Sequence, residues 1–361
     1  MILKKSLARA AAVLTAAALA LMCLSGCGQS KTSNKELNII VWDGTWSEEM
    51  FQDFEKETGI TVNISYVDNT DTLMSKLIQG NADYDLIDLE GAYVKPFVQH
   101  NLLAKIDQSK ITNTKYIVDD YKKTGPIGDE NLEYTVPDMA PSYTSVIVNK
   151  ETCPIKITRF SDLANPKLKN QLAMVNATNS LYGAALQDLG YSAASTDESQ
   201  IAEANALLKK IKKNVKAFVG ESAVSQLESG ECSVAFCWDY PTLCGDSDTN
   251  WDKFEEIPLK GGNEYCMQYW AVPKASTHKK EAQQLINFIL RPKELAKCYK
   301  EYYAVPLEKK SAIAKYLPKN YYKNPSIKSS QRLLHNSWNV SIDEKQIALM
   351  DTYYTKLMGE K

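Results

Sequence analysis

The chain has 361 residues, 42 lysines and arginines, 44 aspartates and glutamates, and a formal net charge of −2 at pH 7. This balance leaves no basic stripe for nucleic acid and no polybasic segment for an anionic membrane surface. Beyond the N-terminal region no run of about 18 apolar residues occurs, so the sequence predicts no further membrane span.

The N-terminus carries the parts of an export signal in the expected order. Three basic residues precede an uncharged apolar stretch, Ala10 to Leu24, that is too short for a comfortable membrane span. It runs into Leu-Ser-Gly-Cys27, which resembles the bacterial lipobox, where the cysteine receives a diacylglycerol after cleavage just before it. We therefore predict a lipoprotein signal peptide at residues 1–26, lipidation of Cys27, and a flexible polar tether within residues 27–36. The alternatives are an ordinary secretory signal with an incidental cysteine and an uncleaved anchor helix.

Cleavage before Cys27 leaves 335 residues, which is enough for two lobes of ordinary size. The cleaved segment carries three cations, so the mature chain has a net charge of −5. A mildly acidic chain suits a cationic ligand, but most soluble proteins of this charge bind no cation.

Six cysteines remain after Cys27, and export permits disulfides between them. Fifteen pairings are possible, so the sequence assigns none, and free buried thiols are an equal alternative. The tightest spacing is Cys-x4-Cys and the three histidines are scattered, so neither a zinc site nor any other cofactor is expected. The six are Cys153, Cys232, Cys237, Cys244, Cys266 and Cys298.

Strand and helix signals alternate along the mature chain. The apolar run Leu37–Trp42 predicts a buried strand, and the capping-box spacing from Thr45 to Glu48 predicts the start of a helix that Gly59 ends. The initial β-α-β-α-β order implies an α/β fold with a mostly parallel sheet and covering helices. Further strands are expected at 60–66, 84–89, 143–149, 232–238 and 265–273, and further helices at 72–79, 180–190, 201–213 and 279–290.

Four stretches together carry a family resemblance. They are the strand ending in Trp42 with the helix ending at Phe54–Gly59, then Asp83–Leu86, then Leu189–Ser192, and finally Ala271–Pro273 followed by Leu285–Pro292. In this order and spacing they resemble the spermidine/putrescine-binding family of extracellular solute-binding proteins of ABC importers. The resemblance covers nearly all of residues 37–361.

The resemblance implies a two-lobed periplasmic-binding-protein fold of type II, with mixed or parallel sheets, covering helices and a hinge. The ligand would lie in the cleft between the lobes, which close on it. It assigns residues 37–145 and 268–311 to lobe 1, and residues 146–267 and 312–361 to lobe 2.

The same resemblance suggests aromatic ligand-binding residues. A polyamine needs carboxylates for its ammonium groups and aromatic faces for its methylenes. Trp42, Trp238 and Tyr303 match the family's aromatic residues in type. The alternative for each is packing in a core.

The family's carboxylates are missing. Gly44, Ala177, Ser180 and Gln268 stand where polyamine binders carry acids, and a buried ammonium without a partner costs several kcal/mol. Nearby, Cys266 replaces a family tryptophan and Asn339 a glutamine.

Other acids follow predicted strands or occupy loops near the expected cleft. Asp43 follows Trp42, Glu90 follows the third strand, Asp239 follows Trp238, and Asp138 lies in a loop. We hypothesise that Asp43, Glu90 and Asp239 form a rearranged cation site; the alternative is that acids in loops are solvated. The full set of expected ligand-binding residues is Trp42, Asp43, Glu90, Trp238, Asp239, Gln268, Tyr303 and Asn339.

These observations favour a lipid-anchored, monomeric solute-binding component of an ABC importer, on the outer face of the cytoplasmic membrane at the cell surface or in the periplasm. It would deliver a spermidine- or putrescine-like ligand to permease subunits energised by a separate ATPase. A different small polar or cationic solute, such as another amine, an amino acid derivative or a thiamine-like cation, is the first alternative, and a signalling co-receptor role is another. A secreted enzyme lacks support, because no HExxH, GxSxG, supported SxxK or Walker-type motif occurs.

Overall fold

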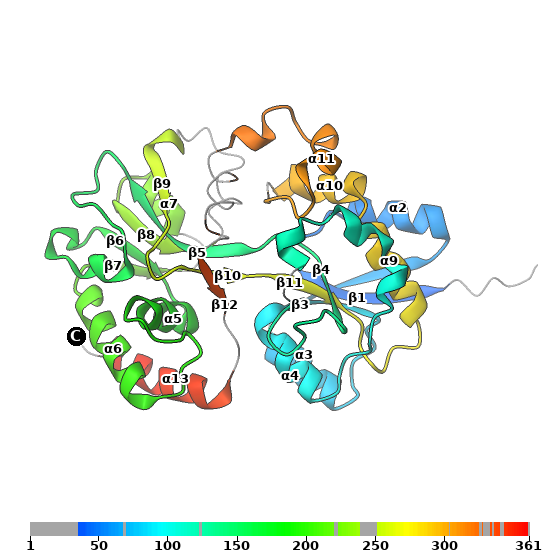
Figure 1. Ribbon diagram of the computed structural model, residues 1–361, viewed down its shortest axis with the longest axis horizontal. Coiled ribbons are helices and arrows are strands. Elements are labelled where there is room, and N and C mark those ends of the chain that lie inside the picture. Colours follow the sequence, from blue (N-terminus) through cyan, green and yellow to red (C-terminus); the bar gives the residue numbers. More distant parts are fainter. Residues whose placement is uncertain are drawn as a thin grey trace, which may run out of the picture.

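The computed structural model describes residues 35–67, 70–122, 125–219, 223–238, 251–302, 304–324, 327, 333, 336–339 and 343–359. In these ranges the chain forms two α/β lobes that lie side by side and are joined by crossing strands (Figure 1). The expected fold class is thereby confirmed. Within the same ranges, no helix combines the length and apolarity that a membrane span requires.

The first lobe is built on a five-stranded mixed sheet with the order β2-β1-β3-β11-β4. Its strands are β1 (Glu36–Trp42), β2 (Thr61–Val67), β3 (Leu86–Glu90), β4 (Thr135–Pro137) and β11 (Gln268–Ala271). β1 pairs in parallel with β2 and β3, whereas β11 runs antiparallel to β3 and β4. The parallel start matches the β-α-β-α-β prediction.

Helices cover both faces of this sheet, with α2 and α10 on one side and α3 and α4 on the other (Figure 1). Ser47, not Thr45, is the N-cap of α2, so the predicted capping box does not form; Gly59 ends α2 with φ 72°, as predicted. The helices are α2 (Glu48–Thr58), α3 (Thr70–Ile78), α4 (Gly91–Gln99), α9 (Lys279–Ile289), α10 (Pro292–Tyr302) and α11 (Lys310–Ile313). Single 3-10 turns occupy Gln108–Lys110, Thr112–Tyr116, Asp119–Lys122, Ala314–Tyr316 and Tyr321–Lys323.

The second lobe contains a seven-stranded sheet with the order β12-β10-β5-β8-β6-β7, and β9 pairs with β5. Its strands are β5 (Ser142–Asn149), β6 (Leu172–Val175), β7 (Val215–Val219), β8 (Val234–Cys237), β9 (Phe254–Ile257), β10 (Asn263–Cys266) and β12 (Ser337–Asn339). Its helices are α5 (Thr178–Asp188), α6 (Glu198–Lys212), α7 (Ala223–Glu228) and α13 (Glu344–Gly359), with 3-10 turns at Phe160–Ala164, Pro166–Leu168 and Trp251–Lys253. α5, α6 and α13 form one layer (Figure 1).

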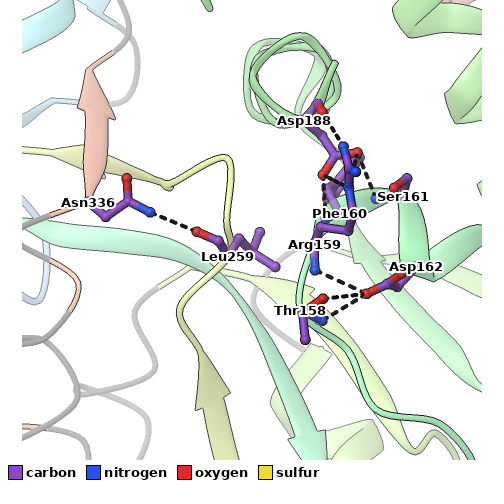
Figure 2. Close-up of polar contacts among 8 residues, drawn as sticks. All are labelled: Thr158, Arg159, Phe160, Ser161, Asp162, Asp188, Leu259 and Asn336. Atoms are coloured by element: carbon purple, nitrogen blue, oxygen red, sulfur yellow. Dashed lines mark hydrogen bonds and ion pairs between the residues drawn. The ribbon is translucent and has the colours of Figure 1, made fainter. Parts of the chain in front are cut away.

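The carboxyl end of α5 is fixed by a buried carboxylate (Figure 2). Asp188 accepts hydrogen bonds from the backbone N–H groups of Phe160 at 3.0 Å and Ser161 at 3.2 Å. The guanidinium of Arg159 adds a bond from Nε to the same carboxylate at 3.1 Å. These donors offset the desolvation of a nearly inaccessible charge and hold α5 in place.

Two adjacent chain segments cross between the sheets. One segment runs from β4 into β5, and the other runs from β10 into β11. β4 pairs antiparallel with β11, and β5 pairs antiparallel with β10, so the two segments form one two-stranded ribbon. Pro137 pairs with Tyr269 and Ser142 with Cys266, so residues 138–141 stand opposite only residues 267–268. We call these two stretches the hinge segment, because an unequal residue count bends and twists a ribbon. The expected single strand at 265–273 is accordingly broken at Met267.

Buried side chains form a separate core under each sheet. Ile313, Leu317, Tyr321 and Ile327 belong to the core of the five-stranded sheet. This packing differs from the boundary expected from sequence, which assigned residues 312–361 as a whole to lobe 2. The last described helix, α13, does pack in the second core, through Met350 and Leu357.

No disulfide joins two of the described cysteines, which are Cys153, Cys232, Cys237, Cys266 and Cys298. Cys244 lies outside the described residues. Cys298 is buried, and its sulfur accepts a hydrogen bond from the backbone N–H of Ser47 at 3.3 Å. Burial also raises the pKa of its thiol to about 12, which disfavours the reactive thiolate.

The tight contact between α5 and β12 yields a stability prediction. A Cβ at Gly183 would lie 2.4 Å from the ring of Trp338, which is itself 8% exposed. Gly183→Ala should therefore lower the free energy of unfolding by about 1–3 kcal/mol, although alanine favours helix formation. Urea unfolding measures the change. Gly359→Ala is the control, since a Cβ there meets nothing within 4 Å; equal stability of the two variants would contradict the prediction.

Candidate functional site

The candidate site lies where the strand ends of the first sheet meet the hinge segment. Trp42 is the last residue of β1, and Glu90 is the last residue of β3. Gln268 is the register partner of Glu90 on β11. Ligands of open α/β sheets bind at the carboxyl ends of the parallel strands, which is where Trp42 and Glu90 lie, and Gln268 begins β11 next to Glu90.

Glu90 is half-buried at this edge. Its Oε1 lies 3.5 Å from the hydroxyl of Thr70, and it is the N-cap of α4. Burial raises the pKa of its carboxyl to about 7, and the charges of Asp88, Asp71 and Glu264 add to that rise. These causes all favour the protonated form of the Glu90 carboxyl relative to an exposed glutamate.

The backbone after Glu90 approaches the hinge segment closely. The N–H of Gly91 donates to the carbonyl of Met267 at 2.8 Å. A Cβ at Gly91 would lie only 2.9 Å from that carbonyl oxygen, so a side chain would push β3 away from the hinge segment. Glycine thus keeps Glu90 next to the crossing ribbon.

A buried carboxyl pair lies behind Glu90. Asp88 accepts a 2.7 Å hydrogen bond from the indole N–H of Trp46, whose ring centroid lies 4.6 Å from that of Trp270. Burial raises the pKa of Asp88 to about 6 and, together with the charge of Asp88, raises the pKa of Asp138 well above its ordinary value. Both shifts disfavour the state in which the two carboxyls are ionised together. Asp138, expected in a loop near the cleft, is fully buried.

Glu264 supplies a carboxyl from the second lobe. It lies on β10 opposite Thr144, whose hydroxyl donates to its Oε2 at 2.7 Å. Ser180 at the start of α5 is hydrogen-bonded to it as well. Burial still raises the pKa of Glu264. Ser180 is one of the positions where the family resemblance led us to expect an acid; here the carboxyl near this position of α5 comes from strand β10 instead.

Sequence reasoning missed Glu264. The only sequence signal was a single glutamate in the short run Asn-Glu-Tyr-Cys, two residues before Cys266. A charged residue that alternates with apolar ones normally faces solvent. The pairing of β10 between β5 and β12 buries it instead, and that pairing is not readable from the local pattern.

Two of the other expected residues, Trp238 and Asn339, lie in the second lobe. Trp238 follows β8, whose last residue Cys237 pairs with Ser145, so the indole is attached beside Thr144 and packs partly against the second core. Asn339 pairs with Tyr265 across β12 and β10 and is hydrogen-bonded to it. Tyr265 and Glu264 alternate along β10, so Asn339 does not converge on Glu264.

The remaining expected residues are not brought into the site by the described structure. Asp43 follows β1 and is exposed. Asp239, Tyr303 and Cys27 lie outside the described residues. Of the hypothesised trio of acids, Glu90 alone is thus seen at the junction, where it is half-buried. Trp42 is partly buried, and its indole N–H has no hydrogen-bond acceptor within the described part of the chain.

The electrostatics of the junction are one-sided. The pKa values of Asp88, Glu90, Asp138 and Glu264 are all raised, and within the described ranges none of the groups that shift them is a cation. A positive ligand group would supply the missing counter-charge and favour their ionised forms. No described group of three or more histidines, cysteines, aspartates or glutamates is arranged to hold a metal ion.

Comparison with known proteins gives a consistent result. Residues 49–328 match the model of a family described as bacterial extracellular solute-binding protein. The chain is 29% identical over 328 residues to the spermidine/putrescine-binding periplasmic protein of Salmonella typhimurium, covering 90% of this chain and 92% of that protein.

Solved structures share the fold. A putative spermidine/putrescine ABC transporter from Listeria monocytogenes superposes with a TM-score of 0.75 at 23% identity, covering 91% of this chain and all of that one. The Tp0655 (TpPotD) lipoprotein of Treponema pallidum superposes with a TM-score of 0.77 at 22% identity, covering 90% and 99% of the two chains.

The raised pKa of Glu90 yields a pH prediction. Its folded-state pKa of about 7 exceeds the ordinary value of 4.5, so its contribution to stability falls as pH rises from about 4.5 to 7. Glu90→Gln removes that loss and should raise the free energy of unfolding at pH 8 by up to about 3 kcal/mol, with little change at pH 4. Urea unfolding at both pH values tests this; a variant less stable than wild type at pH 8 would refute it.

Proposed function

Because the chain belongs to the bacterial extracellular solute-binding protein family, we propose that it captures a polyamine or a closely related amine between its two lobes. The observation that carries the proposal is the half-buried Glu90 carboxyl at the end of β3, the strand next to the one that ends in Trp42; its pKa is raised, and within the described ranges none of the groups that shift it is a cation. An ammonium group suits that carboxyl, and an indole face suits the adjoining methylenes. The relative from Salmonella typhimurium, named for spermidine and putrescine, supports the same class of ligand.

The proposal includes delivery to an ABC importer. The captured ligand would pass to permease subunits driven by a separate ATPase, and the chain itself is a binding protein rather than an enzyme, as its family is. We further propose lobes that move about the hinge segment, since a ligand that contacts both lobes favours their closed arrangement.

A lipid anchor at Cys27 is part of the same proposal. The lipobox-like Leu-Ser-Gly-Cys27, after an uncharged apolar stretch, supports it. An anchored monomer stays near its permease, which raises its effective concentration there.

A different small cation or polar solute is the second candidate. Gly44, Ala177, Ser180 and Gln268 occupy the positions of the acids expected in polyamine binders. With those charges absent, the spacing of ammonium groups that the site accepts can differ from that in spermidine. Another amine, an amino acid derivative or a thiamine-like cation would then be the solute.

A ligand screen tests the proposal. The melting temperature of residues 31–361 should rise in the presence of about 1 mM putrescine or spermidine. That concentration is roughly 100 Kd for a ligand with a Kd of about 10 μM, and a ligand that binds only the folded state stabilises it by about 2.7 kcal/mol at that excess. Differential scanning fluorimetry provides the measurement, with sodium chloride of equal ionic strength as the control. Stabilisation by an amino acid or thiamine but by neither amine would favour the second candidate.

A further inference from the structure

We infer that Glu264 acts with Glu90 as a two-carboxyl receptor for one ammonium group of the ligand, at the end of the binding site next to the hinge segment. This inference rests on the proposed function and names a ligand-recognising residue that the sequence pattern did not reveal. The two carboxyls come from different lobes, β3 in the first and β10 in the second.

The Glu264 carboxyl is positioned but not saturated. Thr144 donates to Oε2 at 2.7 Å, and Ser180 forms a further hydrogen bond. A carboxylate offers about four lone-pair directions, so two hydroxyl donors leave room for an ammonium N–H. The two hydroxyls come from β5 and from the first turn of α5, and they fix the direction of the side chain from two sides.

Glu264 and Glu90 are brought together by the ribbon. Glu264 lies two residues before Cys266, and Gln268, two residues after it, is the register partner of Glu90. The charge of Glu264 is the smallest of the named contributions that raise the pKa of Glu90, which is consistent with the two carboxyls facing each other across the bend of the ribbon. Like charges repel across the hinge segment, and one cation between them turns that repulsion into attraction to a shared centre.

This arrangement also accounts for the acid missing at residue 180. A glutamate side chain at that position would compete with Glu264 for the same space and would add a further buried negative charge. Serine instead donates a hydrogen bond to a carboxyl that arrives from β10. The negative charge is retained near α5, but it is carried by a strand that continues directly into the hinge segment.

The experiment measures the Kd for putrescine by isothermal titration calorimetry at pH 8, on residues 31–361. Glu264→Gln and Glu90→Gln should each weaken binding at least about ten-fold, because each removes one charged partner of a buried ammonium. Glu231→Gln, an exposed acid of the same lobe that pairs with Lys216, is the matched control and should change Kd by less than about two-fold.

The double variant Glu90→Gln/Glu264→Gln tests whether both carboxyls receive the same ammonium group. If they do, the increases in Kd caused by the two single substitutions are not independent. The Kd of the double variant should then be several-fold lower than the value obtained by multiplying the two single-variant increases. A double-variant Kd equal to that product would mean that the two carboxyls bind different ammonium groups, and it would overturn the inference.

Folding and recognition are separated by two readouts. The ligand-free melting temperature of Glu264→Gln should not fall below that of wild type at pH 8, and Glu264→Asp provides a second variant that keeps the charge on a shorter side chain and should bind more tightly than Glu264→Gln. Equal affinity of wild type and Glu264→Gln overturns this inference alone. Absence of binding by wild type to both putrescine and spermidine overturns the proposed amine function as well.

Discussion

The antiparallel ribbon formed by β4–β5 and β10–β11 is the constraint on which the rest of the structure depends. Each of its two segments begins in one sheet and ends in the other. Backbone hydrogen bonds hold the two segments together within each sheet, so the lobes are joined by a paired ribbon and not by single loops alone. Residues 138–141 opposite 267–268 interrupt its register once, and a local interruption confines bending to that point. Glu90, Gln268 and Glu264 all lie within a few residues of this interruption, so any movement there changes their separation.

The junction illustrates how a candidate binding site can oppose the stability of its own fold. Asp88, Glu90, Asp138 and Glu264 lose hydration without gaining a protein cation in the described structure, and each consequently has a raised pKa. By contrast, Asp188 is just as inaccessible but receives two backbone N–H groups and a guanidinium. Buried acids with complete partners serve architecture, and those without them are suited to a ligand.

Much of the fold was predictable from sequence because its longer elements carry clear periodicity. The strand Leu37–Trp42 and the helix ended by Gly59 were predicted within a residue or a few, and both matter for the site because they place Trp42. Strands of three or four residues, such as β4 and β12, are too short to give a pattern and exist through their partners. The burial of Glu264 and of Asp138, which does lie in a loop as expected, was not predicted for a related reason: it is decided by long-range pairing, not by neighbours in sequence.

The direction of β1 has a mechanical consequence. β1 begins at Glu36, at the end of the strand remote from the junction, and is paired in parallel with β2 over seven register positions (Figure 1). Tension applied from the chain's N-terminus therefore acts lengthwise on this ladder, in shear. Its hydrogen bonds share the load and must fail together, whereas bonds peeled from one end fail singly. The lobe that bears Glu90 is in this way reinforced against pulling along the direction in which the chain enters it.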